Sequence, residues 1–341
     1  IDTLNPTVVV DIVDGSLNDG DSSSLVTFEF SEDVSGFDAT DLSSAAGTLS
    51  NFTVIDGNSY TATFTANDGL ETTGSVTVAA TYTDLAGNTG ATGSDNVAID
   101  TLNPTVVVNI LDSQLNDGDP SSSVTFEFSE NVIGFDATDL SSAEGTFSNF
   151  TVIDGDSYTA IFTATDGLET TGSVTVTATY TDQAGNIGAT GSDTVTINTL
   201  NPTVVVNIVD GLLNDGDPSS LVTFEFSKDV IGFDSTDLSS TEGTLSDFTV
   251  IDGNSYTAIF TTTDGLETTG SVTVAATYTD QVGNTGTTGS DNVTIDTLNP
   301  TVVVDIVDGS LNDGDSSSLV TFEFSEDVSG FDATDLSSAA G

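Results

Sequence analysis

The chain has 341 residues and a formal net charge of −53 at pH 7, because 54 acidic residues stand against a single base, Lys228. It contains no His and no Cys. This composition excludes a nucleic-acid partner, which would need a basic surface, and it lacks the residues of zinc sites and nucleophile–base pairs. We therefore do not expect an enzyme. No stretch approaches the ~20 apolar residues of a membrane-spanning helix, so direct membrane insertion is not expected either.

The sequence repeats itself with a period of 98 residues. The string IDTLNPTVVV begins at Ile1, Ile99 and Ile295, and INTLNPTVVV begins at Ile197. We call residues 1–98, 99–196 and 197–294 repeats 1, 2 and 3, and residues 295–341 the partial repeat 4. Because repeat 4 is incomplete, we expect the chain to be an internal window of a longer protein.

Apolar residues in each repeat recur at every second position, which is the period of a β-strand. In repeat 1, Val26, Phe28 and Phe30 alternate with Thr27 and Glu29. Clusters of Gly, Asp and Asn separate such runs, and no segment has a helical period. The number and spacing of the strands indicate an all-β fold in which two antiparallel sheets pack face to face. Seven strands are predicted in repeat 1, near residues 8–12, 26–30, 41–43, 52–54, 60–64, 76–82 and 97–99.

The negative charge requires compensation that the chain does not supply. Carboxylates without basic partners repel one another and destabilise a compact state. Divalent cations neutralise such groups, and Ca²⁺ prefers carboxylate and carbonyl oxygens. The alternative is general screening in a high-salt environment. We favour specific calcium sites because of where the acids lie.

The acids gather in loops at the two ends of each predicted sandwich. An odd number of antiparallel strands places the two termini of a repeat at opposite poles. Loops near 31–38, 56–58 and 83–90 then lie at the N-terminal pole, and loops near 14–22, 43–48 and 67–73 at the C-terminal pole. Stacked repeats bring the C-terminal pole of one against the N-terminal pole of the next. The connector is only Thr101–Asn103, followed by the rigid Pro104, and so short a connector favours a calcium site over a repulsive hinge.

The candidate calcium ligands are therefore the acidic and amide side chains of the pole loops and of the connectors. In turns, such residues also commonly bond to their own backbone, so a purely structural role stays open for each of them. The candidates are Asp2, Asp84 and Asn88 before repeat 1; Asp14, Asp19, Asp21, Asp68, Glu71, Asp100, Asp136, Asp182 and Asn186 between repeats 1 and 2; Asp112, Asp117, Asp119, Asp166, Glu169, Asn198, Asp234, Asp280 and Asn284 between repeats 2 and 3; and Asp210, Asp215, Asp217, Asp264, Glu267 and Asp296 at the end of repeat 3.

One base and one amide distinguish repeat 3. Glu32 is set aside as a ligand because its counterpart in repeat 3 is Lys228, and the linker residue Asp100 has Asn198 as its counterpart. Less negative charge attracts a divalent ion less strongly. The joint between repeats 2 and 3 is therefore predicted to bind calcium least tightly.

Two signatures recur, FSE-x-V-x-GF and YTD-x-AGN, which repeat 1 shows as FSEDVSGF and YTDLAGN. They resemble the bacterial Ig-like repeats of giant surface adhesins, which often carry RTX-type C-termini. The resemblance covers every repeat and implies tandem seven-stranded Ig-like β-sandwiches in a linear rod, at the bacterial cell surface. It further implies a spacer that calcium stiffens. Repeat 3 departs from the signatures at Lys228 and Val282.

Three functions follow as hypotheses. The first is a structural extender of an extracellular adhesin, in which each repeat has its neighbouring repeats as partners. The second is a set of binding modules that grip carbohydrate or protein weakly and gain strength through multivalency. The third is a filament or biofilm matrix protein whose chains associate laterally through calcium. Near-identical repeats favour the extender, because a specialised binding domain would differ from its neighbours.

Overall fold

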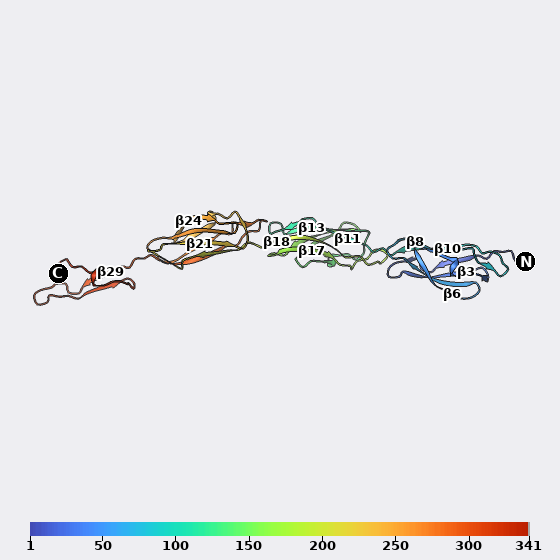
Figure 1. The fold of residues 1–341 in the computed structure, drawn as a ribbon, viewed down its shortest axis with the longest axis horizontal. Coiled ribbons are helices and arrows are strands. Elements are labelled where there is room, and N and C mark those ends of the chain that lie inside the picture. The colour runs from blue at the N-terminus through green and yellow to red at the C-terminus, as the bar shows by residue number, and fades with distance from the viewer. Residues whose placement is uncertain (340–341) are drawn as a thin grey trace. The chain divides into compact units, whose positions relative to one another are not determined.

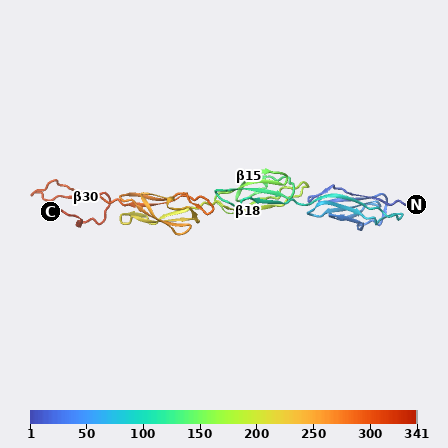
Figure 2. The same ribbon diagram turned by 90° about the horizontal axis from the view of Figure 1, so that it is seen from above.

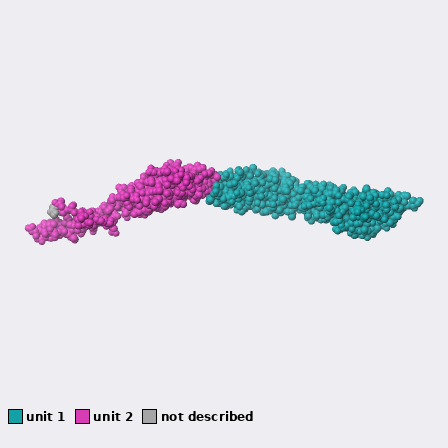
Figure 3. Space-filling view, in the orientation of Figure 1, with its two compact units in different colours: residues 1–200 teal, residues 201–341 magenta. Residues whose placement is uncertain are grey.

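The computed structural model describes residues 1–339 and forms two compact units, residues 1–200 and 201–341 (Figure 3). Repeats 1 and 2 lie in the first unit together with residues 197–200, and the rest of repeat 3 and repeat 4 belong to the second. Within the described residues no helix is long or apolar enough to cross a membrane. The only helices among them are single 3₁₀ turns: η1 (Ala39–Asp41), η2 (Ala137–Asp139), η3 (Ser235–Asp237) and η4 (Ala333–Asp335).

Repeat 1 forms two four-stranded sheets and a short additional ladder (Figure 1). One sheet has the order β1-β3-β7-β6 and the other β2-β10-β8-β5. Each strand is short and presents one face to the core. The strands are β1 (Val8–Ile12), β3 (Ser23–Phe30), β7 (Ser59–Ala66) and β6 (Gly47–Val54); β2 (Ser16–Leu17), β10 (Gly93–Asp100), β8 (Glu71–Val78) and β5 (Leu42–Ala45); and the ladder of β4 (Val34–Ser35) with β9 (Thr83–Asp84).

Repeats 2 and 3 have the same two-sheet arrangement (Figure 2). In repeat 2 the sheets are β11 (Val106–Ile110), β13 (Ser121–Phe128), β16 (Ser157–Ala164) and β15 (Gly145–Val152), and β12 (Gln114–Leu115), β18 (Gly191–Asn198), β17 (Glu169–Val176) and β14 (Leu140–Ser141). In repeat 3 they are β19 (Val204–Ile208), β21 (Ser219–Phe226), β25 (Ser255–Thr262) and β24 (Gly243–Val250), and β20 (Leu212–Asn214), β28 (Gly289–Asp296), β26 (Glu267–Val274) and β23 (Leu238–Thr241), with the ladder of β22 (Val230–Ile231) and β27 (Thr279–Asp280). The described part of repeat 4 contains one sheet, β29 (Val302–Ile306) with β30 (Val320–Phe324).

The predicted all-β fold of tandem Ig-like sandwiches is confirmed, but in repeat 1 the ladder of β4 and β9 adds two short strands to the seven predicted, and the first strand also differs. That strand is divided between the two sheets: β1 pairs antiparallel with β3, whereas β2 pairs parallel with β10. Ile12 and Leu17 are both buried, one on each side of the crossing. The chain changes sheets around Gly15 because both apolar residues can then face the core. The sequence pattern alone had indicated only the segment near residues 8–12.

The alternation that predicted the strands also fills the core. In β3, Val26, Phe28 and Phe30 are buried, whereas Leu25 is exposed. Phe37 lies edge-on to Phe30, with ring centroids 4.8 Å apart. Such edge-to-face contacts add to the stabilisation from burial. The aromatic residues thus concentrate in the N-terminal half of each sandwich, directly beneath the loops of that pole.

A buried tyrosine ties these loops to the core. The hydroxyl of Tyr180 donates to the carbonyl oxygen of Ala189 at 2.5 Å and to that of Pro104 at 3.5 Å. A Cβ atom on Gly188 would lie only 2.0 Å from the same ring. Burial raises the pKa of Tyr180 to about 12, so the hydroxyl stays protonated and able to donate. The loop that contains Gly188 and Ala189 is therefore held in contact with the Tyr180 ring.

In repeat 1, the outer strand of the sheet β1-β3-β7-β6 carries a bulge. Edge strand β6 loses its register with β7 between Ser50 and Thr53, and Asn51 has a φ of 53°. Asn149 and Asp247 take the same conformation in repeats 2 and 3. Bulges twist an edge strand and disfavour edge-to-edge pairing between chains. This edge is therefore poorly suited to lateral association through backbone hydrogen bonds.

Candidate metal centre

Three carboxylates meet at the N-terminal pole of repeat 2. Asp100 ends β10, Glu130 follows β13, and Asp182 lies in the loop before β18. One carboxylate oxygen from each lies within 4.8 Å of the other two. Asp2, Glu32 and Asp84 form the same arrangement in repeat 1. We call these two sets the N-pole clusters.

Hydrogen bonds hold the buried member of each cluster in place. The Asp182 side chain is 1% exposed. Its Oδ1 accepts from the backbone N–H groups of Gly185 and Asn186 at 2.7 and 2.9 Å, and its Oδ2 accepts from Asn186 Nδ2 at 2.7 Å. In repeat 1, Asn88 donates to Asp84 from both its backbone and its side chain. The YTD-x-AGN signature therefore builds a loop around one fixed carboxylate.

The clusters leave carboxylates close together without a base. Burial raises the pKa of Glu130, and Asp182, Asp100 and Glu71 raise it further by repulsion. Burial, followed by repulsion from Asp2 and Asp84, likewise raises the pKa of Glu32. Repulsion of this kind disappears when a cation binds between the groups.

Asp84 shifts in the opposite direction. Burial alone would raise the pKa of its carboxyl group, but hydrogen bonds from Asn88, Gly87 and Ala86 outweigh burial and lower it. The N-pole cluster of repeat 1 thus combines Asp84, which its hydrogen bonds keep ionised, with Glu32, whose charge its surroundings oppose.

The C-terminal pole of repeat 1 contacts the loop of repeat 2 that holds Asp182. The backbone N–H of Asp19 donates to Asn186 Oδ1 at 2.8 Å, and Asn18 Nδ2 donates to the carbonyl oxygen of Ala184 at 2.5 Å. Asn186 Nδ2 also donates to the backbone oxygen and to Oδ1 of Asp100, at 2.8 and 3.2 Å. Asn186 therefore links the two repeats, and its carbonyl oxygen is already engaged by Asp19.

Asp19 itself adds negative charge at this joint. Burial raises the pKa of its carboxyl group, and repulsion from Asp68, Asp182 and Asp100 raises it further, whereas a hydrogen bond from Asn103 opposes the shift. Two loops of repeat 1 and the connector thus lie close to the cluster. The joint therefore collects acids from both repeats.

The residues present fit a calcium ion. Oxygens that bind one calcium ion at about 2.3–2.6 Å lie no more than about 5 Å apart, and Ca²⁺ takes only oxygen ligands. Asp100, Glu130 and Asp182 meet this spacing and offer six carboxylate oxygens between them. No nitrogen or sulfur ligand stands among them, so zinc is a poorer match. Bound there, a calcium ion would supply charge neutralisation and cross-linking.

The predicted ligands fall into four groups. Asp2, Asp84, Asp100 and Asp182 belong to the N-pole clusters, and Asn88 and Asn186 orient them. Asp19, Asp68 and Glu71 interact electrostatically at the joint. Asp136 and Asp234 instead cap η2 and η3, each accepting from a threonine N–H at 2.7 Å. The others lie in or beside the equivalent pole loops, or at strand ends next to them: Asp14, Asp21, Asp112, Asp117, Asp119, Asp166, Glu169, Asn198, Asp210, Asp215, Asp217, Asp264, Glu267, Asp280, Asn284 and Asp296.

The N-pole clusters also contain Glu32, which the sequence analysis sets aside because of Lys228, and Glu130, which is not among the predicted ligands. In repeat 3, Lys228 Nζ lies 3.5 Å from Asp280 Oδ2. A signal was nevertheless present in the repeats. The two positions occupied by Asp2 and Glu32 change together, to Asn198 and Lys228, whereas the position of Asp84 stays acidic. Positions that change together are often positions in contact.

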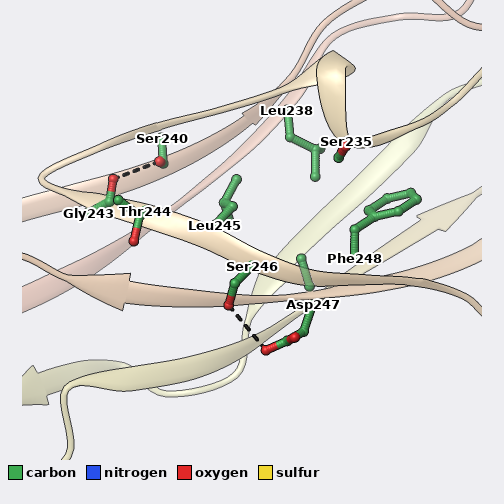
Figure 4. Close-up of a pocket in the computed structure, with 10 residues that line it drawn as sticks. Ser235, Leu238, Ser240, Gly243, Thr244, Leu245, Ser246, Asp247 and Phe248 are labelled. Carbon is green, nitrogen blue, oxygen red and sulfur yellow. Dashed lines mark hydrogen bonds between the residues drawn. The ribbon is translucent and has the colours of Figure 1, made fainter.

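A second feature is a shallow cleft of about 560 Å³ on the side of repeat 3. Figure 4 shows Leu238, Leu245 and Phe248 along it, with Ser246 donating to Asp247 near its margin. A cleft at the equivalent place in repeat 1 includes Phe52. Polar side chains line the cleft about as much as apolar ones, and a mixed lining of this kind can hold a small polar ligand. These clefts are the natural location for the multivalent-binding hypothesis.

The chain was compared with known proteins by sequence and by structure. No curated protein sequence matches the chain. Among solved structures, the Escherichia coli adhesin FdeC is 14% identical, covering 86% of this chain and 98% of its own, with a TM-score of 0.29. Invasin, a bacterial integrin-binding protein, is 15% identical, covering 95% and 68%, with a TM-score of 0.30. The titin I-band fragment I67–I69 is 8% identical, covering 86% and 96%, with a TM-score of 0.34.

At these identities the likeness to solved structures concerns the fold alone, and the low TM-scores carry no functional argument. The match to a domain family is more extensive. The bacterial Ig-like domain family matches residues 2–99, 100–199, 198–295 and 296–341, and the chain therefore belongs to this family.

Proposed function

We propose that this chain is an extender segment of an extracellular bacterial adhesin, and that calcium at the joints stiffens it. One observation carries the proposal. Asp100 ends a strand of the first sandwich, whereas Glu130 and Asp182 belong to the second, and their carboxylates converge. An ion bound by all three would tie the two sandwiches together.

The connector between these repeats has little freedom of its own. The hydroxyl of Thr101 donates to the carbonyl oxygen of Asn67, and its backbone N–H donates to that of Leu70. On the other side, Ala189 donates to the carbonyl oxygen of Pro104. Only two residues remain between the anchored ends. A short anchored connector supports the role of a spacer, because distance is maintained only if joints do not fold back.

Calcium completes this arrangement by removing the remaining repulsion. Without a cation, the N-pole cluster and Asp19 oppose contact between the repeats. With one, the same charges attract a shared ion. Calcium concentration then sets the stiffness of the joint, and the extender is stiffest in the calcium-rich extracellular medium.

Small-angle X-ray scattering of the full chain at fixed ionic strength tests the proposal. We expect calcium to narrow the distribution of conformations and increase the radius of gyration relative to EDTA, with a smaller effect of magnesium because of its stricter geometry. The double variant Asp100→Asn/Glu130→Gln should lose the response. The control Asp11→Asn/Glu127→Gln removes the same charge elsewhere and should keep it. Identical curves in EDTA and calcium would contradict the calcium part of the proposal.

The same experiment addresses lateral association. A calcium-dependent doubling of the scattering mass would favour the filament hypothesis, in which ions bridge separate chains. An unchanged mass with a changed radius favours the extender.

The clefts on repeats 1 and 3 favour multivalent binding as a second candidate, with carbohydrate as the ligand class. A glycan array probed with the full chain tests it. The variant Ser246→Arg would obstruct the cleft of repeat 3, and Ser50→Arg that of repeat 1. Binding that the double variant abolishes would establish this function, whereas binding unaffected by it would have another location.

A further inference from the structure

The N-terminal pole of repeat 3 keeps the loop of repeats 1 and 2 but changes its charge. Lys228 follows Phe226 at the end of β21, in the place where Glu130 follows Phe128 at the end of β13. Asp280 and Asn284 correspond to Asp182 and Asn186. The carboxylate at the centre of the loop is thus retained, and the glutamate beside it is exchanged for a base.

The retained carboxylate is held by similar hydrogen bonds to its counterpart in repeat 2, although one backbone donor comes from a different position of the loop. Asp280 Oδ1 accepts from the backbone N–H groups of Val282 and Asn284, each at 3.0 Å, and Oδ2 accepts from Asn284 Nδ2 at 2.9 Å. Its side chain is 3% exposed. Burying an ionised carboxylate is costly unless it is paired. The hydrogen bonds offset part of that cost, and a positive charge beside Asp280 would offset more of it, as we propose for Asp182 in repeat 2.

Lys228 supplies that charge. Its Nζ lies 3.5 Å from Asp280 Oδ2, and its side chain is 21% exposed. Most of the alkyl part of the Lys228 side chain is therefore packed against the protein, and its ammonium group points toward the buried carboxylate of Asp280. A cation is thus present at the equivalent point of the loop, and it belongs to the chain itself.

We propose that Lys228 is a built-in cation that takes the place of the divalent ion in repeat 3. The loop of residues 280–286 is then stable without calcium, and the ammonium group repels a second cation from Asp280. This inference rests on the proposed function, because it presumes that an ion binds in repeat 2. The chain then carries calcium-responsive and calcium-independent poles side by side in its sequence.

Hydrogen–deuterium exchange of the full chain, followed by mass spectrometry, tests this. Peptides covering residues 182–188 and 280–286 differ at Ala184 and Val282 and at Ile187 and Thr285, so their masses separate them. At fixed ionic strength, we expect calcium to slow exchange in residues 182–188 by about tenfold relative to EDTA, because binding stabilises only the folded loop. Residues 280–286 should exchange at the same slow rate in both conditions.

Reciprocal variants sharpen the test. Lys228→Glu should make residues 280–286 exchange faster in EDTA and recover protection with calcium. Glu130→Lys should slow exchange of residues 182–188 in EDTA and remove their calcium response. Lys228→Met, which removes the charge without adding an acid, should speed exchange of residues 280–286 in EDTA.

The outcomes separate the two proposals. If residues 280–286 of the unaltered chain respond to calcium as strongly as residues 182–188, Lys228 does not replace the ion. If Lys228→Glu leaves residues 280–286 insensitive, the lysine does not exclude it, and the inference is again overturned. If no loop responds to calcium, the calcium part of the proposed function fails. The measurements in EDTA then decide separately whether the lysine stabilises the loop. In EDTA, Lys228→Met should change exchange of residues 280–286, and Glu130→Lys should change exchange of residues 182–188, without any ion.

Discussion

The backbone N–H of Asp19 donates a hydrogen bond of 2.8 Å to Oδ1 of Asn186, although 167 residues separate them along the chain. The side-chain amide of Asn186 also donates hydrogen bonds from its Nδ2 to the carboxylates of Asp182 and Asp100. One side chain therefore contacts the pole of the first repeat, the connector and the buried carboxylate of the second repeat.

Asn186→Ala should destabilise the chain more than Asn88→Ala. Both variants remove local hydrogen bonds to an aspartate, but only Asn186 also bonds to the preceding repeat. Leaving the N–H of Asp19 and the buried carboxylate of Asp182 without these partners should cost about 2–3 kcal/mol, roughly 1 kcal/mol more than the change at Asn88. Calorimetry of the two single variants in the same buffer measures the difference. Equal destabilisation would show that the bonds across the joint contribute nothing.

Chelation should lower the melting temperature of the chain. An ion that binds the folded joint and not the unfolded chain stabilises it by about 2.7 kcal/mol at a concentration 100 times the dissociation constant. Thermal unfolding is to be compared in calcium, magnesium and EDTA at constant ionic strength. Coinciding curves in EDTA and calcium would favour general charge screening over specific binding.

Asp100→Asn should weaken calcium binding at the first joint about tenfold, because one charge close to a divalent ion is removed. The replacement is the residue that repeat 3 itself has at the equivalent position, Asn198. Asp11→Asn is the matched control, since repeats 2 and 3 have Asn109 and Asn207 there. Isothermal titration calorimetry of both variants measures the effect. An unchanged affinity in Asp100→Asn would mean that the linker charge does not set the strength of binding.

In EDTA, Glu130→Gln should stabilise the chain at neutral pH and have little effect near pH 4. Burial and neighbouring acids raise the pKa of Glu130 above its ordinary 4.5, so the folded state binds the proton more tightly than the unfolded chain. Stability from this group is present below about pH 4.5 and lost as the pH rises through the folded pKa. We expect the variant to melt roughly 2–5 °C higher at pH 7.

Calcium should reverse this order, because the carboxylate then contributes a ligand. Glu127→Gln removes the same charge from a position near the end of β13 and serves as the control in both conditions. A higher melting temperature of Glu130→Gln in calcium as well would exclude Glu130 from the site.

Gly188→Ala should destabilise repeat 2 by about 3 kcal/mol, because the new methyl group overlaps the ring of Tyr180 and one of them has to move. Gly15→Ala is the control, since nothing lies within 4 Å of a Cβ atom there, and its effect should stay within about 0.5 kcal/mol. Chemical unfolding measures both variants. A tolerated alanine at Gly188 would mean that the loop above Tyr180 moves easily.

Much of the fold could be predicted from the sequence because its information is local. The alternation of Val26, Phe28 and Phe30 specifies a strand with one buried face, and the 98-residue period specifies the number of sandwiches. The division of the first strand was not visible, because β2 contributes only Ser16 and Leu17 and too short a pattern to detect.

The candidate site was predictable only in part. Positions at the poles follow from strand order, which is how Asp19, Asp100 and Asp182 were identified together. The direction of each carboxylate depends on nearby backbone donors instead. Asp136 turns toward Thr138 because a 3₁₀ helix starts there, and Glu130 turns toward the cluster. The orientation of these two side chains cannot be predicted from the spacing of residues in the sequence.

The parallel pairing of β2 with β10 has a mechanical consequence. Both strands run in the same direction, so the chain enters each sandwich near one pole and leaves it near the other. Tension applied to the two ends of a sandwich pulls the two strands past each other along their length. The hydrogen bonds between them are then loaded together instead of being opened one after another. A sandwich built in this way resists stretching more strongly than its modest number of bonds between these strands would imply.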